Sequence, residues 1–145
     1  MSGSIRRAFL LDLEPGHRVL DSETSKYLVT VLRLAEGDNV FFFDGQGNRA
    51  SAEIIETHRN KTHVLIKPAT FSEPLEPTLH LCCALPKTDR AEWIIEKCSE
   101  LGVSSIHWVT CERSQAPKKD HAKKFERWRR IAREAARQSH NDWVP

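Results

Sequence analysis

A polar, proline-containing segment divides the sequence into two parts with different hydrophobic periods. The segment Ser72–Pro77 reads SEPLEP, and its two prolines lack the amide N–H that regular pairing requires. Short apolar stretches separated by glycine turns precede it, whereas strand-like and helix-like stretches alternate after it. The sequence therefore predicts a domain over residues 1–72, a linker over residues 73–78 and a second domain over residues 79–145.

The first part is predicted to be rich in β-structure. Asp44–Gly47 is a strong turn signal, because its two glycines supply the positive φ that tight turns need. One helix is expected over Glu23–Leu34, capped by Asp21 or Ser22 and ended by Gly37. Strands are predicted over residues 8–13, 39–43, 50–57 and 63–68. This order is typical of a small β-barrel.

The second part reads strand, helix, strand, helix. Leu79–Leu85 is a nearly continuous apolar run, as expected for a strand covered on both faces. Asp89 and Glu92 resemble a capping box at the start of a helix that Gly102 would end. A strand over residues 105–110 and a helix over residues 120–139 follow. Such an order predicts a parallel sheet. Because two strands do not complete one, either partner chains supply the rest or this is the front part of a longer protein.

The final predicted helix carries a strong positive charge. Lys118–Arg137 holds nine basic and three acidic residues, a net charge of +6, although the chain of 145 residues as a whole carries only +2. A local field of this kind suits a polyanion such as RNA. The alternative is a solvated basic face anchored in the core by Trp128, which lies on the same helical face as Ala132 and Ala135.

Two loops at the carboxyl ends of the predicted parallel strands are the best candidates for a binding site. Ligands of open α/β sheets bind outside these ends, where Lys87 and Arg90 follow the first strand. Arg113 follows the second strand and could bind a phosphate through two hydrogen bonds. The alternatives are solvated charges for the first pair and an ion pair with Glu112 for Arg113.

Several other classes of protein receive no support from the sequence. The four cysteines lack C-x-x-C or zinc spacing and are expected to be buried and reduced, and no metal site is predicted. The longest apolar runs are far below the roughly 18 residues of a membrane span. The N-terminus lacks a stretch apolar enough for a signal peptide, so a cytoplasmic location is expected. Phe41–Phe43 is expected to be strand and core rather than a platform for stacking bases.

Short motifs in a fixed order resemble one known family. They are Arg6-Arg7-Ala8-Phe9, Val31-Leu32-Arg33-Leu34 with Gly37-Asp38, Phe43-Asp44-Gly45-Gln46-Gly47, Ala84-Leu85-Pro86-Lys87 with Asp89-Arg90, Glu92 to Val103, Glu112-Arg113-Ser114, Arg127-Trp128, Ile131-Ala132, Glu134-Ala135-Ala136, Gln138-Ser139 and Val144-Pro145. Through them the chain resembles the uridine-N3 methyltransferases of small-subunit (16S) ribosomal RNA, ribosomal small subunit methyltransferase E, of the SPOUT superfamily.

The resemblance implies a PUA-like RNA-binding barrel followed by the first part of a knotted α/β methyltransferase domain. It implies a homodimer that transfers a methyl group from S-adenosylmethionine to N3 of a uridine in 16S rRNA. The RNA contacts that it implies are Arg6, Arg7, Arg33, Lys87, Arg90 and Arg113, and Glu134 and Gln138 are weaker candidates at the rim of a catalytic site. Arg33 could equally face solvent.

The sequence departs from the family pattern in two places. The family's C-terminal half, which builds most of the cofactor pocket, has no counterpart here, so no cofactor-binding residue is expected in this chain and the chain alone is expected to be inactive. His140-Asn141 also stands where the family usually has Gly-Arg. The rival hypothesis is an RNA-binding module without catalysis. A purely structural dimerisation protein would leave the +6 helix unexplained.

Overall fold

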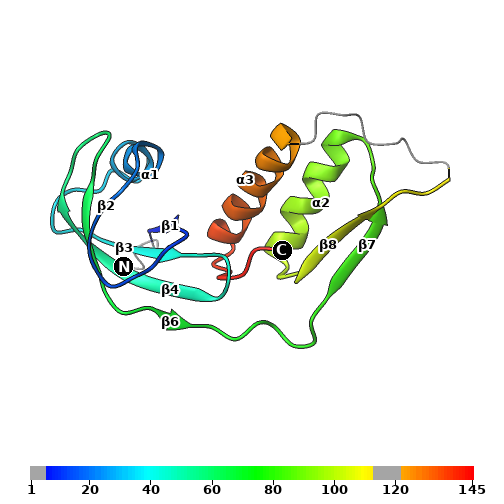
Figure 1. Cartoon of the computed structure of the whole chain (residues 1–145), viewed down its shortest axis with the longest axis horizontal. Coiled ribbons are helices and arrows are strands. Elements are labelled where there is room, and N and C mark those ends of the chain that lie inside the picture. The colour runs from blue at the N-terminus through cyan, green and yellow to red at the C-terminus, as the bar shows by residue number, and fades with distance from the viewer. Residues whose placement is uncertain (1–5, 113–121) are drawn as a thin grey trace. The chain divides into compact units, whose positions relative to one another are not determined.

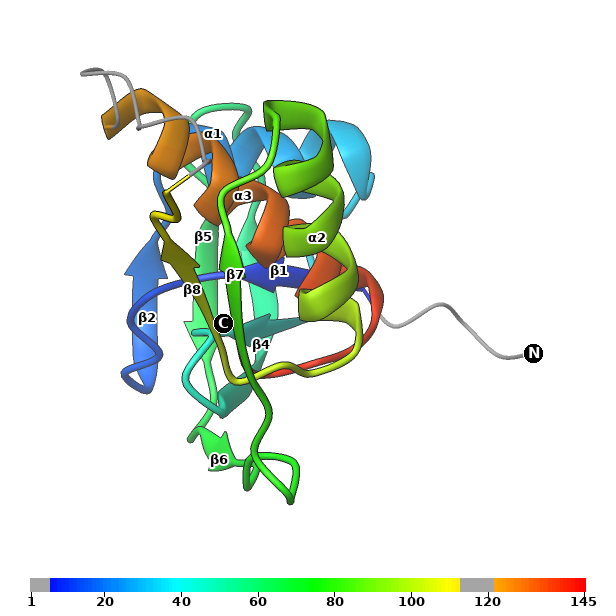
Figure 2. The ribbon, with the colours of Figure 1, turned by 90° about the vertical axis from the view of Figure 1, so that its right-hand side faces the viewer.

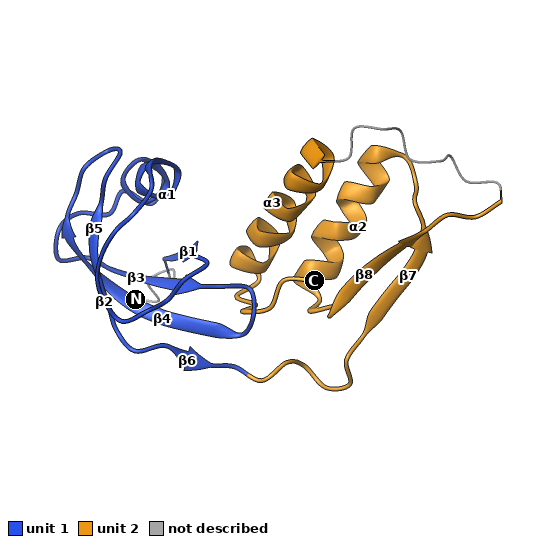
Figure 3. Cartoon of the chain, in the orientation of Figure 1, with its two compact units in different colours: residues 1–72 blue, residues 73–145 orange. Residues whose placement is uncertain are grey.

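The computed structural model describes residues 6–112 and 122–145. The chain forms two compact units, Met1–Ser72 and Glu73–Pro145 (Figures 1 and 3). Each unit buries its own cluster of apolar side chains. The hydrophobic period changes where one unit gives way to the other, because paired strands dominate the first and strand–helix alternation the second.

The first unit is built on a six-stranded sheet with the order β1-β3-β4-β5-β2, in which β6 pairs with β4. β1 runs parallel to β3, and the other pairs are antiparallel. The strands are β1 Arg7–Phe9, β2 Gly16–Val19, β3 Asn39–Phe43, β4 Asn48–Glu56, β5 His63–Ile66 and β6 Thr70–Phe71. The strands predicted over residues 39–43, 50–57 and 63–68 are therefore confirmed, whereas the one predicted over residues 8–13 is shorter and ends where β3 gives way to its turn.

The predicted turn between β3 and β4 is held by one carboxylate. Asp44 accepts hydrogen bonds from the amides of Gln46 at 2.7 Å and Asn48 at 3.1 Å. Gly45 and Gly47 both adopt positive φ. The turn sets the register in which Val40 pairs with Ala52, so that alternate residues of both strands enter the core.

The helix of the first unit starts as predicted but ends early. Asp21 caps α1 (Ser22–Lys26) by accepting from the amide of Thr24 at 2.8 Å. The chain then continues as a π-helix, η1 (Tyr27–Val31), in which the amide of Leu32 donates to the carbonyl of Tyr27. The prediction that the helix reaches Leu34 is therefore wrong. The helical segment ends at Val31, Arg33 adopts a left-handed backbone, and Leu34 is buried in the core.

The second unit has the predicted order, with β7 (His80–Ala84), α2 (Thr88–Glu100), β8 (Ser105–Val109) and α3 (Ala122–Gln138). β7 and β8 pair in parallel, as expected. Gly102 ends α2 with a φ of 74°, and the amide of Val103 donates to the carbonyl of Cys98 across it. The predicted capping box is wrong: the N-cap is Lys87, Asp89 lies in the first turn, and Glu92 binds a side chain of α3 instead.

Both helices pack on the same face of the two-stranded sheet. Ile106 and Trp108 face the cluster that contains Ala91, Ile95 and Trp128. Figure 2 looks onto the opposite face, whose exposed residues are His80, Cys82, Ala84, His107 and Val109. The expectation that residues 79–85 would be covered on both faces is therefore wrong, since both helices of this unit lie on one side.

The cysteines also differ from expectation. All four are free thiols, but Cys82 and Cys111 are exposed, and Cys83 and Cys98 are half-buried rather than buried. Burial raises the pKa of both half-buried thiols, which keeps them protonated at neutral pH. Among the described helices, none is both long and apolar enough to cross a lipid bilayer.

Candidate nucleic-acid interface

The carboxyl ends of β7 and β8 meet at one edge of the sheet, because the parallel register places Ala84 opposite Val109. Lys87 and Arg90 lie at this edge on the N-terminal end of α2, and both side chains are exposed. Neither forms a hydrogen bond or ion pair within the described ranges. Thr110–Glu112 leaves β8 at the same edge. Arg113, which the sequence also places here, lies outside the described residues.

Two free cations beside a helix N-terminus suit an anion. The unpaired amides of the first turn carry a partial positive charge, so acidic side chains are the usual neighbours there. Cations at this position raise the local potential further and are available to a phosphate group. By contrast, Lys97 on the same helix donates to Glu96 at 2.8 Å and to Glu100 at 3.0 Å, so its charge is already balanced.

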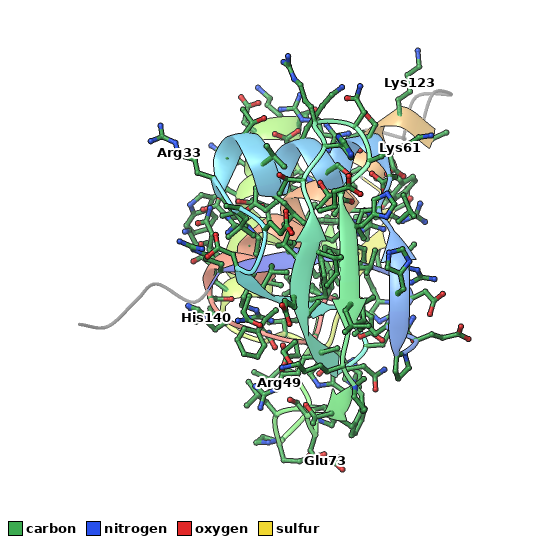
Figure 4. All side chains as sticks on the ribbon, turned by 90° about the vertical axis from the view of Figure 1, so that its left-hand side faces the viewer. Arg33, Arg49, Lys61, Glu73, Lys123 and His140 are labelled. Carbon is green, nitrogen blue, oxygen red and sulfur yellow. The ribbon has the colours of Figure 1, made fainter. Side chains whose placement is uncertain are left out.

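The basic face of α3 is partly neutralised by nearby acids. Arg127 binds Glu92 of α2 at 2.7 Å, Arg129 lies 3.7 Å from Glu126, and Arg137 binds Glu134. Lys123 extends into solvent (Figure 4), and no ion pair or hydrogen bond joins it to another residue that the structure describes. The effective positive charge of this helix is therefore smaller than its composition indicates.

Trp128 anchors α3 in the core, as the sequence predicted. Its side chain is buried, and its ring lies 5.4 Å from Trp108 and 5.5 Å from Phe125, measured between centroids. The ammonium of Lys124 lies 4.8 Å above the same ring. Trp128 is thus a packing residue, and the basic residues around it form the solvated face. The prediction for Phe41–Phe43 is also confirmed in the main: Phe42 and Phe43 are fully buried, and Phe41 is partly exposed.

Glu134 and Gln138 are brought together on the last turns of α3. Gln138 donates to Glu134 at 3.2 Å, and the Nε of Arg137 donates to it at 2.9 Å. The hydrogen bonds from Arg137 hold the pKa of Glu134 below its usual range. A carboxylate with a lowered pKa is a weak proton acceptor, so the geometry favours a positioning role for this pair.

The candidate cations of the first unit differ greatly in exposure. Arg6 forms an ion pair with Asp38 at 3.1 Å, and both side chains remain partly exposed. Arg7 is only 5% exposed, and its guanidinium lies 4.6 Å above the ring of Phe43. Arg33 is exposed and points away from the fold (Figure 4). Of these three, Arg33 is the most accessible to a phosphate, and Arg7 serves packing.

Sequence reasoning missed the link between α2 and α3 that Glu92 and Arg127 form. No local pattern marks this pair, because it depends on how the two helices pack. Sequence reasoning also missed the left-handed backbone of Arg33 and His140. Within residues 6–112 and 122–145, no group of three or more His, Cys, Asp or Glu side chains is placed to hold a metal ion.

Family models match both units in order. A model of an RNA methyltransferase domain matches residues 73–145, and a model of an RNA methyltransferase PUA domain matches residues 20–67. The chain belongs to this RNA methyltransferase family. The resemblance drawn from the sequence motifs is confirmed, because curated relatives of the chain carry the name ribosomal RNA small subunit methyltransferase E.

Two of these relatives come from Bacillus subtilis and Synechocystis. The chain is 33% identical to the first over 129 residues, which cover 87% of this chain and 50% of the relative. It is 38% identical to the second over 120 residues, which cover 82% of this chain and 38% of the relative. The chain thus spans about half the length, or less, of the curated methyltransferases it matches.

Solved structures of this family superpose closely on the chain. Ribosomal RNA small subunit methyltransferase E from Neisseria gonorrhoeae, bound to S-adenosylmethionine, gives a TM-score of 0.85 at 26% identity, covering 98% of this chain and 60% of that one. A Legionella pneumophila protein in complex with the same cofactor gives 0.84 at 27% identity, covering 99% and 61%. The expected fold class, a PUA-like domain followed by α/β structure of the SPOUT type, is confirmed.

Proposed function

We propose that this chain is the RNA-docking and first catalytic-domain portion of a ribosomal RNA methyltransferase that acts on N3 of a uridine in 16S rRNA. The observation that carries the proposal is the match of two RNA methyltransferase models to the two units in order. Exposed cations in both units, Arg33 in the first and Lys87 and Arg90 in the second, supply contacts for phosphates. Arg6 and Arg113 complete the proposed set, and Arg7, whose guanidinium is buried against Phe43, is proposed to support it by packing.

The proposed reaction requires removal of the proton from N3 of uridine, whose pKa lies above neutral. A positioned base or a donor that stabilises the developing oxyanion would assist that step. Gln138 has an amide that can donate to a base edge, and Glu134 holds that amide in place. We therefore assign this pair to positioning the target nucleotide and assign the proton to no described residue.

S-adenosylmethionine is the proposed cofactor, and it supplies a methyl group on a positively charged sulfur. Lys87 and Arg90 do not fit a sulfonium, because both are cations, whereas they fit a phosphate. We therefore assign no described residue to the cofactor. Its binding residues are proposed to belong to the part of the longer relatives that this chain does not span, which would leave the chain inactive by itself.

The second candidate function is an RNA-binding module without catalysis. The observation that favours it is the exposure of Arg33, Lys87 and Arg90, because these cations suit RNA binding and none of them suits methyl transfer. A homodimer acting in the cytoplasm is part of the first proposal. Light scattering of the purified chain tests the dimer directly.

One experiment separates these functions. Transfer of a labelled methyl group to 16S rRNA by the chain distinguishes an enzyme from a binder, and calorimetric titration with S-adenosylmethionine tests whether the chain holds the cofactor. RNA affinity is measured in parallel over a range of salt concentrations. Failure to bind RNA at about 50 mM salt would contradict both functions.

A matched pair of variants on α2 tests the proposed phosphate contacts. Replacing both Lys87 and Arg90 by Ala is expected to reduce the slope of log affinity against log salt by about 0.7–0.9 for each phosphate that is no longer neutralised. Replacing Lys97 by Ala on the same helix should leave the slope unchanged, because its ammonium is bound by Glu96 and Glu100. Equal slopes for all three proteins would remove Lys87 and Arg90 from the interface.

A further inference from the structure

Two residues other than glycine adopt a left-handed backbone in the part of the chain that the structure describes. Arg33 has a φ of 53° and His140 a φ of 59°, whereas glycines hold the other positions of positive φ. A Cβ atom is disfavoured in this conformation, and glycine is the usual choice where a helix ends in it. Each of the two residues lies two positions beyond the last residue of a helix.

The fold requires the left-handed turn at Arg33 but does not require an arginine there. Leu34, the next residue, is buried, and so is Leu28 in η1. The amide of Leu34 donates to the carbonyl of Leu28 at 3.0 Å, and this bond closes the turn across Arg33. Glycine at position 33 would make the same backbone bond and leave both leucines in the core.

The preceding helical turn is irregular as well. α1 passes into the π-helix η1, in which the amide of Leu32 donates five residues back to Tyr27. Single π-turns occur frequently at functional sites. Val31, at the end of η1, is 64% exposed. Two departures from regular helix therefore lie next to each other and present Val31 and Arg33 to solvent.

The side chain of Arg33 contributes nothing visible to the fold. It is exposed and directed outward (Figure 4), and it has no ion pair or hydrogen bond with any residue in the described ranges. Other arginines of the same unit are engaged, as Arg6 is with Asp38 and Arg18 with Asp12. The guanidinium of Arg33 is planar and carries five N–H donors, so it is suited to a ligand that accepts hydrogen bonds. Such a role would also explain a strained backbone at this position.

We propose that Arg33 is an RNA-phosphate contact retained at the expense of stability, so that the turn after η1 is a binding element of the first unit. The inference rests on the proposed RNA-binding function and adds to it a trade-off between the stability of the fold and the affinity for RNA. Replacing Arg33 by Gly should stabilise the fold and weaken RNA binding together. A residue with a purely structural role would not couple these two effects in opposite directions.

His140 provides a matched control within the same chain. It follows α3, and the amide of Asn141 donates to the carbonyl of Ala136 at 2.9 Å across it. Its side chain is exposed (Figure 4). Replacing His140 by Gly relieves the same kind of backbone strain without removing a guanidinium group.

The experiment compares the full chain with its R33G, R33K and H140G variants at about pH 8. Thermal unfolding gives the midpoint Tm, and fluorescence anisotropy with a labelled hairpin of 16S rRNA gives the affinity between about 50 and 200 mM salt. R33G is expected to raise Tm by roughly 2–4 °C, lower the affinity about 3- to 10-fold at the lower salt concentration and reduce the salt slope by about 0.7–0.9. R33K should retain the slope and the original Tm.

H140G is expected to raise Tm by a similar amount with unchanged affinity. If the unaltered chain binds RNA and R33G binds it with the same affinity and slope, the assignment of Arg33 is overturned and the proposed function stands. If R33G fails to raise Tm, the trade-off is overturned. If the unaltered chain does not bind the hairpin at any salt concentration, the proposed function and this inference fall together.

Discussion

The two units of this chain have similar lengths but very different cores. The first buries twelve apolar residues in its main cluster, and they come from β1, β3, β4 and β5, from the segment around α1 and η1, and from the loop before β2. The second fully buries four residues in its main cluster, and half-buried side chains such as Leu85 and Ile106 complete it. The difference follows from topology, because both helices of the second unit cover only one face of its two strands.

Both units leave large apolar side chains in solvent, among them Leu11 and Val31 in the first. Trp93 is 62% exposed and Leu101 74% exposed, both on or next to α2. Since the stabilisation from burial scales with the apolar area removed from water, the second unit has the smaller margin. We therefore expect the first unit to be the more stable of the two, and the second to depend more strongly on each buried residue.

The largest expected effect is the loss of Trp128. Replacing Trp128 by Ala removes the biggest side chain of the smaller core and should cost about 3–5 kcal/mol of unfolding free energy. The second unit should then unfold while the first stays folded. Amide NMR spectra of the full chain would show native signals for residues of β3–β5 and collapsed dispersion for residues of α2 and β8. Loss of both sets of signals would contradict the expectation that the first unit stays folded when the second unfolds.

A milder variant at the same position separates packing from hydrogen bonding. The indole Nε1 of Trp128 is buried without a partner among the described residues. Replacing Trp128 by Phe therefore removes volume but no observed hydrogen bond, and a cost of only about 1–2 kcal/mol is expected. A cost as large as that of the Ala variant would mean that the indole N–H is satisfied in solution.

Much of the contrast between the two units was predictable from the sequence, because it depends on the hydrophobic period and on the residue types at the turns. The switch of period at Ser72–Pro77, the Asp44–Gly47 turn and the left-handed Gly102 all read directly from local residue types. The one-sided sheet was not predictable, because an apolar run such as Leu79–Leu85 says nothing about which face a helix covers. The pairing of Glu92 with Arg127 depends on how two helices pack, which no local pattern encodes.

The candidate site was predictable in residue type but not in availability. The sequence identified Arg7 and Arg33 alike as basic residues in family motifs. The structure buries the guanidinium of Arg7 against Phe43 and leaves that of Arg33 in solvent. Burial of a charged group depends on strand register and cross-strand neighbours, so it appears only once the sheet is assembled.

An intermediate effect is expected at two glycines, one in each unit. Gly37 and Gly102 both adopt positive φ, at 84° and 74°. A Cβ added at Gly37 meets nothing within 4 Å, whereas one added at Gly102 lies 2.5 Å from Cδ1 of Leu75. Replacement by Ala should cost about 1 kcal/mol at Gly37 and about 2 kcal/mol at Gly102, as measured by urea unfolding followed in each unit.

The side chain of Leu75 determines how far the free-energy costs of the Gly37 and Gly102 replacements differ. Its side chain can move, and Asn141 lies 3.4 Å from the same added Cβ position. Combining Leu75→Ala with Gly102→Ala should remove the steric part of the cost and leave only the part due to φ. If the double variant loses as much as the sum of the two single variants, the contact between Leu75 and the turn contributes nothing to the difference between the units.

The smallest expected effect concerns two surface carboxylates whose pKa values are lowered for different reasons. The pKa of Asp38 in the first unit is lowered mainly by the amide of Ala35, which donates to it at 2.8 Å, and only secondarily by Arg6. The pKa of Glu134 in the second unit is lowered mainly by the side chain of Arg137. A backbone donor survives substitution of a neighbouring side chain, and a side-chain donor does not.

Carbon-detected NMR titration between about pH 2 and 7 tests this difference. Replacing Arg137 by Ala should raise the pKa of Glu134 towards its ordinary value of about 4.3, whereas replacing Arg6 by Ala should leave the pKa of Asp38 clearly lowered.

A carboxylate with a lowered pKa stabilises the fold at pH values above its ordinary pKa, and this contribution is lost as the pH falls through the lowered pKa. The R137A variant should therefore lose stability near neutral pH and converge with the unaltered chain in acid. Because Glu134 is solvent-exposed, the change should stay below about 1 kcal/mol. A larger loss that persists at low pH would show that Arg137 supports the second unit by packing rather than by charge.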